Sequence, residues 1–198
     1  MITLRCATTN PGKLREFRAA AAHFGHGNIA IEPVQGLGGL PAPVEDGQTF
    51  EENAVKKALH YSAYAEEPVF ADDSGLEVDA LGGAPGVYSA RFAGEGATDA
   101  ANNQLLVERL RGVEDRTARF VCVVALARAG ELLGVFRGSV EGRIVDEPCG
   151  PHGFGYDPHF FYPPFGATFG MAEPARKMDV SHRGQALRAM LAWAEAHL

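Results

Sequence analysis

The first part of the chain alternates between apolar runs and amphipathic stretches. The apolar run 2–8 predicts a buried strand. Asn10 and Pro11 then predict a helix start, because asparagine is a favoured cap and proline suits the first helical turn. Residues 29–34 predict a second strand, and the glycine- and proline-rich stretch 36–47 predicts a loop. The apolar face of the first helix would consist of Leu14, Phe17, Ala21 and Phe24.

The middle of the chain carries two helix-capping patterns on either side of an apolar run. Residues 49–52 read Thr-Phe-Glu-Glu, a capping box that predicts a helix over 50–65. The apolar residues 68–71 predict a strand that ends at 72–75, where the sequence reads Asp-Asp-Ser-Gly. Thr98 predicts the cap of another helix, which would close at Gly112.

The last part of the chain predicts a hairpin and a final helix. Residues 119–127 and 132–140 are two apolar runs around Gly130, which is typical of a hairpin. Residues 148–155 predict an ordered loop, and Ser181 predicts the cap of an amphipathic helix. The order of elements predicts an α/β fold with a mixed sheet, in which the hairpin is a candidate part of a second lobe.

Length, charge and cysteine content narrow the functional class. A chain of 198 residues fits one domain of one or two lobes, residues 1–198. The net charge of -7 argues against a nucleic-acid partner, although a small anionic substrate needs only a few local cations. The three cysteines lack metal-ligand spacing and are expected to be reduced thiols. No signal-peptide pattern and no long apolar run is present, so we expect no membrane association and a cytoplasmic location.

The segment 8–13 is a candidate phosphate site. It lies at the predicted strand-to-helix junction, where free backbone N–H groups and the positive end of the helix dipole favour an anion. Thr8, Thr9 and Asn10 add side-chain donors, and Lys13 adds a full charge. The alternative is an ordinary helix cap with a solvated lysine.

The adjacent carboxylates of Asp72 and Asp73 are a candidate metal site. Two carboxylates after an apolar strand are costly unless they are hydrogen-bonded or bind a cation. Carboxylate oxygens suit Mg²⁺, and open α/β sheets bind ligands at strand ends. The alternative is a turn formed by Asp73, Ser74 and Gly75, because these residue types favour turns.

The loop 153–158 and the donors that follow it are candidates for base recognition. The loop reads Gly-Phe-Gly-Tyr-Asp-Pro, so an aromatic ring could stack on a base while the carboxylate accepts N–H groups. The alternative is a tight turn with two packing aromatics. Near the predicted start of the last helix, Lys177, Ser181, His182 and Arg183 gather donors where cations are disfavoured, and positions that break a local rule are often functional. A solvated surface is the alternative.

Together, five segments resemble the inosine triphosphate pyrophosphatase family, also called xanthosine/deoxyinosine triphosphate diphosphatases. Each is weak alone, but they occur in the family's order over nearly the whole chain. The segments are 8–13, 49–58 (TFEENAVKKA), 71–92 (ADDSGLEVDALGGAPGVYSARF), 153–158 and 181–187 (SHRGQAL).

The resemblance implies a two-lobed α/β fold with a long central mixed sheet flanked by helices and an active-site cleft between the lobes. It also implies a homodimer and a Mg²⁺ requirement. Asp73 would hold Mg²⁺ and activate water, with support from Asp72. The substrate would be bound by Thr8, Thr9, Asn10, Pro11, Gly12, Lys13, Lys57, Ser74, Phe154, Gly155, Tyr156, Asp157, Lys177, His182 and Arg183.

One stretch departs from the family's pattern. The family often has two acidic residues before Thr-Gly in the loop that precedes the capped helix, and one of them is a metal ligand. Here residues 43–47 read Pro-Val-Glu-Asp-Gly, so the ligand position falls on Val44 or Glu45. Glu45 is the candidate for the second metal ligand.

The resulting hypothesis is hydrolysis of ITP, dITP and XTP to the monophosphate and pyrophosphate, which would cleanse the nucleotide pool. One alternative is a related pyrophosphatase that prefers other bases, such as modified pyrimidines. Another is a phosphatase that forms an aspartyl-phosphate at Asp73, although the expected D-x-D spacing is absent. A third is a non-catalytic nucleotide sensor, which would have no need of two carboxylates near a triphosphate.

Overall fold

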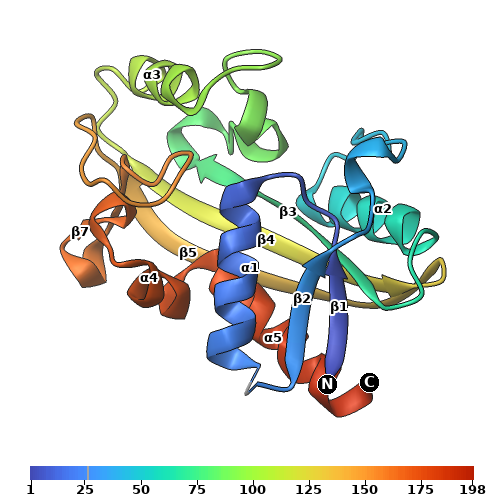
Figure 1. Ribbon diagram of the computed structural model, residues 1–198. Coiled ribbons are helices and arrows are strands. Elements are labelled where there is room, and N and C mark those ends of the chain that lie inside the picture. The colour runs from blue at the N-terminus through green and yellow to red at the C-terminus, as the bar shows by residue number, and fades with distance from the viewer. Residues whose placement is uncertain (26) are drawn as a thin grey trace. The chain divides into compact units, whose positions relative to one another are not determined.

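The computed structural model describes residues 1–25 and 27–198 (Figure 1). The chain divides into two compact units. Unit 1 contains residues 1–73, 122–138 and 183–198, and unit 2 contains residues 74–121 and 139–182. In the part of the chain that is described, no helix is long and apolar enough to cross a membrane.

The strands form one seven-stranded sheet in the order β2-β1-β3-β4-β5-β6-β7. β1 pairs in parallel with both β2 and β3, whereas β6 pairs antiparallel with β5 and β7. This pairing confirms the predicted mixed sheet. The strands are β1 (Ile2–Cys6), β2 (Ile29–Pro33), β3 (Val69–Val78), β4 (Thr117–Arg128), β5 (Glu131–Ile144), β6 (Phe160–Tyr162) and β7 (Ala167–Thr168).

Five α-helices accompany the sheet in the described residues, and four of them were expected from the sequence. They are α1 (Pro11–Phe24), α2 (Phe50–Ser62), α3 (Asp99–Arg109), α4 (Pro174–Val180) and α5 (His182–His197). The short 3-10 turns are η1 (Leu37–Gly39), η2 (Asp79–Leu81), η3 (Gly86–Arg91), η4 (Pro163–Phe165) and η5 (Phe169–Met171).

The predicted helix caps form as the residue types require. The Asn10 side chain accepts hydrogen bonds from the amides of Gly12 and Lys13, and α1 buries Phe17 against Phe70 of β3 in an edge-on ring contact of 5.1 Å. Thr49 caps α2 by accepting from Glu52 N, which satisfies an amide that has no partner within the helix. Thr98 caps α3 in the same way, through Ala101 N.

β3 does not end where the sequence predicted. It continues through residues 72–75 to Val78, so the interpretation of this segment as a strand end or an Asp-Ser-Gly turn is wrong. Strand propensity is overridden here by tertiary contacts. Gly75 is required because a Cβ at this position would lie 2.6 Å from Gly86 O and would also collide with the Ser89 hydroxyl. The two aspartates therefore lie in the middle of a strand.

Three elements near the C-terminus were missed. β6 and β7 have only three and two residues, too few for an alternating pattern to be recognised. α4 begins at Pro174 without a side-chain cap and has seven residues. It ends at Val180, and Ser181 is its C-cap residue as well as the residue before α5.

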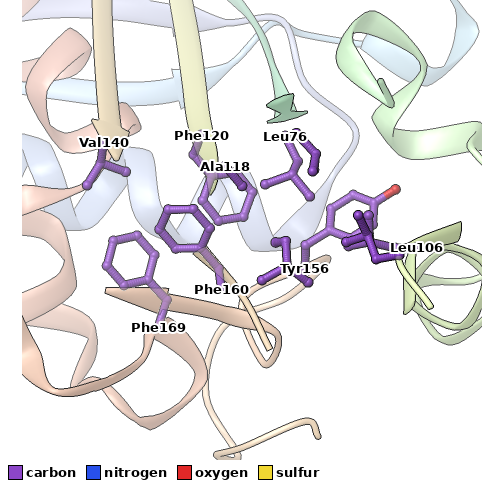
Figure 2. Packing of buried hydrophobic residues seen from close by; sticks show 11 residues of the cluster. Leu76, Leu106, Ala118, Phe120, Val140, Tyr156, Phe160 and Phe169 are labelled. Atoms are coloured by element: carbon purple, nitrogen blue, oxygen red, sulfur yellow. The ribbon is translucent and has the colours of Figure 1, made fainter. Parts of the chain in front are cut away.

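Unit 2 has a core of its own, which fixes the segment that carries the predicted base-binding loop. Figure 2 shows Tyr156 of that loop among Leu76 of β3, Leu106 of α3 and Phe160 of β6. In unit 1, a smaller cluster contains Val34, Tyr61 and Val69.

Candidate active site

The side chain of Asp72 is buried in unit 1 against two cations. Lys13 Nζ lies 3.0 Å from Oδ1 and 2.9 Å from Oδ2, and Arg183 Nη2 lies 3.5 Å from Oδ2. Burial alone would raise the pKa of Asp72, but the charges of Lys13, Arg183 and Lys57 together hold that pKa well below its usual value. Asp72 is therefore ionised and anchors cationic side chains from α1 and α5.

Arg183 is itself almost fully buried, with 3% of its side chain exposed. Its Nη1 lies 2.5 Å from Glu16 Oε2, so the guanidinium joins a carboxylate of α1 to that of Asp72. The Cys122 thiol lies 3.9 Å from Asp72 Oδ2, and burial raises its pKa to about 12. The thiol is therefore neutral and adds no charge to this group.

Asp73 lies beside a different cation, on α2. Its Oδ1 is 3.1 Å from Lys57 Nζ, and its Oδ2 accepts a hydrogen bond of 3.3 Å from Asn53 Nδ2. Burial raises the pKa of Asp73 and outweighs the opposing effect of Lys57. The two neighbouring aspartates thus have pKa shifts in opposite directions, an arrangement that is typical of carboxylates with separate tasks.

Glu45 and Asp73, the two predicted metal ligands, face one ammonium group. Lys57 Nζ lies 2.9 Å from Glu45 Oε2 and 3.1 Å from Asp73 Oδ1, so both carboxylates already converge on a positive charge. The alternative position, Val44, is 74% exposed and carries no ligand atom in its side chain. Within the described ranges, no group of three or more His, Cys, Asp and Glu side chains is placed to hold a metal.

This donor set fits Mg²⁺. A site with one or two carboxylates suits an ion that usually completes its coordination with water and substrate phosphate oxygens. A site built by protein alone would need more ligands than Glu45 and Asp73 provide. The chemistry of the residues therefore agrees with the cofactor that the family resemblance implies.

The segment 8–13 differs in one respect from the predicted phosphate cradle. The amides of Gly12 and Lys13 donate to Asn10 Oδ1, and the Asn10 amide donates to Thr8 Oγ1 at 3.2 Å. The expectation of free amides at these positions is wrong, because the cap residue satisfies them. Thr9 and Pro11 are exposed, and Lys13 Nζ is the charged group that the segment contributes.

The predicted base-binding loop lies in unit 2 and is ordered around Asp157. Asp157 Oδ2 accepts hydrogen bonds from Phe154 N at 2.9 Å and from Lys177 Nζ at 2.6 Å. Lys177 Nζ also lies 5.4 Å from the centre of the Phe154 ring. Gly153 has a φ of 78°, and a Cβ there would collide with the Asp157 carboxylate. The loop therefore presents a carboxylate, an ammonium and an aromatic ring together.

The other candidates in unit 2 are more deeply packed. His182 stacks on Phe120 with ring centres 4.7 Å apart, and Tyr156 donates its hydroxyl proton to Ser89 O at 2.8 Å. Ser74 lies in β3 and is partly buried. The structure thus brings Phe154, Gly155, Tyr156, Asp157 and Lys177 together in unit 2. It brings Lys13, Lys57, Asp73, Glu45 and Arg183 together in unit 1.

Two contacts of these groups were not predicted as parts of the site. Glu16 holds Arg183, and Asn53 donates to Asp73. Asn53 lies one helical turn before Lys57, so their shared face was visible in the sequence. Glu16 gave no such signal, because its partner lies 167 positions away along the chain.

Comparison with known proteins points to one family. A model of the Ham1 family matches residues 4–193. A dITP/XTP pyrophosphatase from Burkholderia pseudomallei (strain K96243) is 53% identical over 192 residues, which cover 94% of this chain and 90% of the relative. Another, from Desulfotalea psychrophila (strain LSv54 / DSM 12343), is 48% identical over 181 residues, covering 91% and 80%.

The solved structures give the same result. A HAM1 protein from Coxiella burnetii superimposes with a TM-score of 0.86 at 39% identity, covering 99% of this chain and 100% of that one. The Staphylococcus aureus Ham1 protein also gives a TM-score of 0.86, at 37% identity with the same coverage. These matches confirm the resemblance that the sequence motifs indicated, and the chain belongs to the Ham1 family.

Proposed function

We propose that this chain hydrolyses the non-standard purine nucleoside triphosphates ITP, dITP and XTP to the monophosphate and pyrophosphate. The relatives at about 50% identity over most of the chain carry the name dITP/XTP pyrophosphatase, which supports the reaction class. The observation that carries the proposal is the pair of neighbouring carboxylates on β3, each beside its own lysine and with opposite pKa shifts.

The phosphate tail is assigned to unit 1. Lys13 and Lys57 are only 18% and 11% exposed, so their charges are weakly screened and attract phosphate oxygens strongly. Phosphoryl transfer depends mainly on positioning and charge neutralisation, which two fixed ammonium groups supply. Asp72 holds Lys13 in place.

Asp73 is assigned as the base. Burial raises the pKa of Asp73, and a raised pKa makes an ionised carboxylate a better proton acceptor. Water attacks the α-phosphorus, and Asp73 accepts the water proton. The α–β anhydride bond breaks, and its electron pair leaves with pyrophosphate. Asn53 and Lys57 orient the carboxylate during this step.

Mg²⁺ is proposed as the cofactor, with Asp73 and Glu45 as its protein ligands. When bound, it neutralises phosphate charge and lowers the pKa of coordinated water. Lys57 lies between the two carboxylates and holds them close to each other.

The base is assigned to the loop in unit 2. Phe154 offers a ring face, Lys177 offers a donor for a purine 6-oxo group, and Asp157 is held ready by two hydrogen bonds. Both Asp157 and Lys177 are buried, with 3% and 7% of their side chains exposed, and their mutual ion pair fixes the polar groups that a base would have to match. The homodimer that the resemblance implies stays a prediction, which sedimentation equilibrium would test.

The direct test is incubation with ITP and Mg²⁺, followed by product analysis. We expect inosine monophosphate and pyrophosphate in equal amounts. Orthophosphate and the diphosphate as primary products would contradict the proposal. A parallel panel of modified pyrimidine triphosphates would identify a different base preference, and acid-quench trapping would detect an aspartyl-phosphate. Binding of ITP without turnover would indicate a nucleotide sensor.

A further inference from the structure

Helix α3 is hydrogen-bonded to the predicted base-binding loop at Gly155. The Gly155 amide donates to Asp99 Oδ2 at 2.7 Å, and Asn103 Nδ2 donates to the Gly155 carbonyl oxygen at 2.9 Å. Asp99 and Asn103 are four residues apart, so they lie on the same face of the helix. Both backbone groups of one loop residue are therefore held by one helix.

These hydrogen bonds lie beside a pocket that the loop and the helix both line. A pocket of about 620 Å³ lies here and is lined by both Asp99 and Asn103 of α3 and by Phe154 and Gly155 of the loop. Tyr156 of the loop packs in one core with Leu106 of α3, but Gly155 has no side chain to pack against the helix. The position of Gly155 depends correspondingly more on its two hydrogen bonds.

Asn103 is a buried polar residue of α3. It is only 9% exposed, and its Oδ1 has no hydrogen-bond partner anywhere in residues 1–25 and 27–198. A buried polar atom without a partner costs stability, whereas an apolar residue of similar shape would remove that cost. The hydrogen bond from Nδ2 to Gly155 is therefore accompanied by a loss of stability at Oδ1. Residues that lower stability in this way cluster at functional positions.

The neighbours of Gly155 are fixed by other means. Tyr156 is anchored in the core of unit 2, as Figure 2 shows, and its hydroxyl donates to Ser89 O. Asp157 is held by Lys177 and by the Phe154 amide. The contacts of α3 with Gly155 add to this set of anchors.

We propose that Asp99 and Asn103 are positioning residues, which hold the loop 153–158 in the conformation that receives the purine base. This inference rests on the proposed function, because it assigns the loop to base binding. Loss of either contact would leave the phosphate-binding lysines of unit 1 unchanged. It would therefore weaken ground-state and transition-state binding equally, raising KM with little change in kcat.

Three variants and one control test the proposal. Asn103→Leu removes the donor and also the unpaired Oδ1, so the gain from removing Oδ1 offsets part of the cost of leaving the Gly155 carbonyl without its donor. Asp99→Ala removes the acceptor for the Gly155 amide, and Asp99→Asn restores an acceptor oxygen without the charge. Thr98→Ala is the control, since it removes the cap of the same helix without touching the loop.

We expect Asn103→Leu and Asp99→Ala to raise KM for ITP about 3- to 10-fold, the value of one net hydrogen bond, with kcat within about twofold. Asp99→Asn should recover most of the loss. Thr98→Ala should lower the melting temperature and leave KM unchanged. A KM near that of wild type in both Asn103→Leu and Asp99→Ala would overturn the proposal. An equal rise of KM in Thr98→Ala would also overturn it.

A second readout separates this inference from the proposed function. Hydrogen exchange of the Gly155 amide, followed by NMR without any nucleotide, should speed up in Asp99→Ala but not in Thr98→Ala. Unchanged exchange in Asp99→Ala would refute the positioning role even if the wild-type chain hydrolyses ITP. Inactivity of the wild-type chain towards ITP, together with faster exchange, would instead refute the proposed function and leave α3 as a loop anchor.

Discussion

Asp72 and Asp73 are neighbours in sequence, yet replacing each by asparagine should have opposite consequences. Asp73→Asn removes the proposed base and metal ligand, so we expect kcat for ITP to fall by about 10²- to 10⁴-fold. Its effect on stability should be small or favourable, because burial raises the pKa of Asp73 and the ionised carboxylate is not favoured by the fold.

Asp72→Asn should instead destabilise the protein. The Asp72 carboxylate faces Lys13 and Arg183, and breaking a buried ion pair from one side costs about 3–5 kcal/mol. Arg183 retains Glu16 as a partner, so we expect a loss of about 3 kcal/mol, near the lower end of that range. Urea unfolding in the presence of EDTA measures this loss without a contribution from a metal.

The pH dependence of stability provides a check on the sign. The pKa of Asp72 is lowered in the folded state, so its contribution is complete above the unfolded-state pKa and is lost as pH falls below it. The stability difference between wild type and Asp72→Asn should therefore shrink in acid. For Asp73 the folded pKa is raised, so its unfavourable contribution is present at neutral pH and disappears as pH falls.

If Asp72→Asn were as stable as wild type at pH 7, or if Asp73→Asn kept kcat within threefold, this division of roles would be refuted.

Three further predictions follow from the same contacts. Lys13→Ala should raise KM and lower kcat alike for every triphosphate tested, whereas the exposed Lys56→Ala should not, and a loss that depends on the base would contradict the phosphate assignment. Lys57→Met should move the acid limb of the kcat/KM profile to higher pH, since it removes a charge that lowers the pKa of Asp73; an unmoved limb would exclude Asp73 as the titrating group. Gly153→Ala should raise KM on the order of 10-fold through backbone strain and collision with Asp157, while Gly166→Ala, with a positive φ but no close neighbour, should leave KM unchanged in the same steady-state assay.

The elements that sequence reasoning placed correctly are those with strong local signals. Asn10, Thr49 and Thr98 each cap the helix that their position predicted, because a cap depends on a few neighbouring residues. The same locality explains one error at the site. Asn10 was expected to leave helix-start amides available for phosphate, yet a good cap consumes those amides.

The features that escaped sequence reasoning depend on contacts between distant segments. Glu16 reaches Arg183 across 167 positions, and Asn103 reaches Gly155 across 52. Nothing in the residues around Glu16 or Asn103 marks them as parts of a site. β6 and β7 were missed because they are short. They form through pairing with β5 and with each other rather than through local strand propensity.

The continuation of β3 through Asp72 and Asp73 has a consequence for the chemistry. Successive side chains of a strand point to opposite faces, so the two carboxylates are directed apart although they are adjacent in sequence. Accordingly, Asp72 contacts Lys13 of α1 and Arg183 of α5, whereas Asp73 contacts Asn53 and Lys57 of α2. A turn would have allowed both carboxylates to face one cation and to repel each other there. The strand instead gives each its own counterion, so one can be held ionised as an anchor while the other is left with the raised pKa that a base requires.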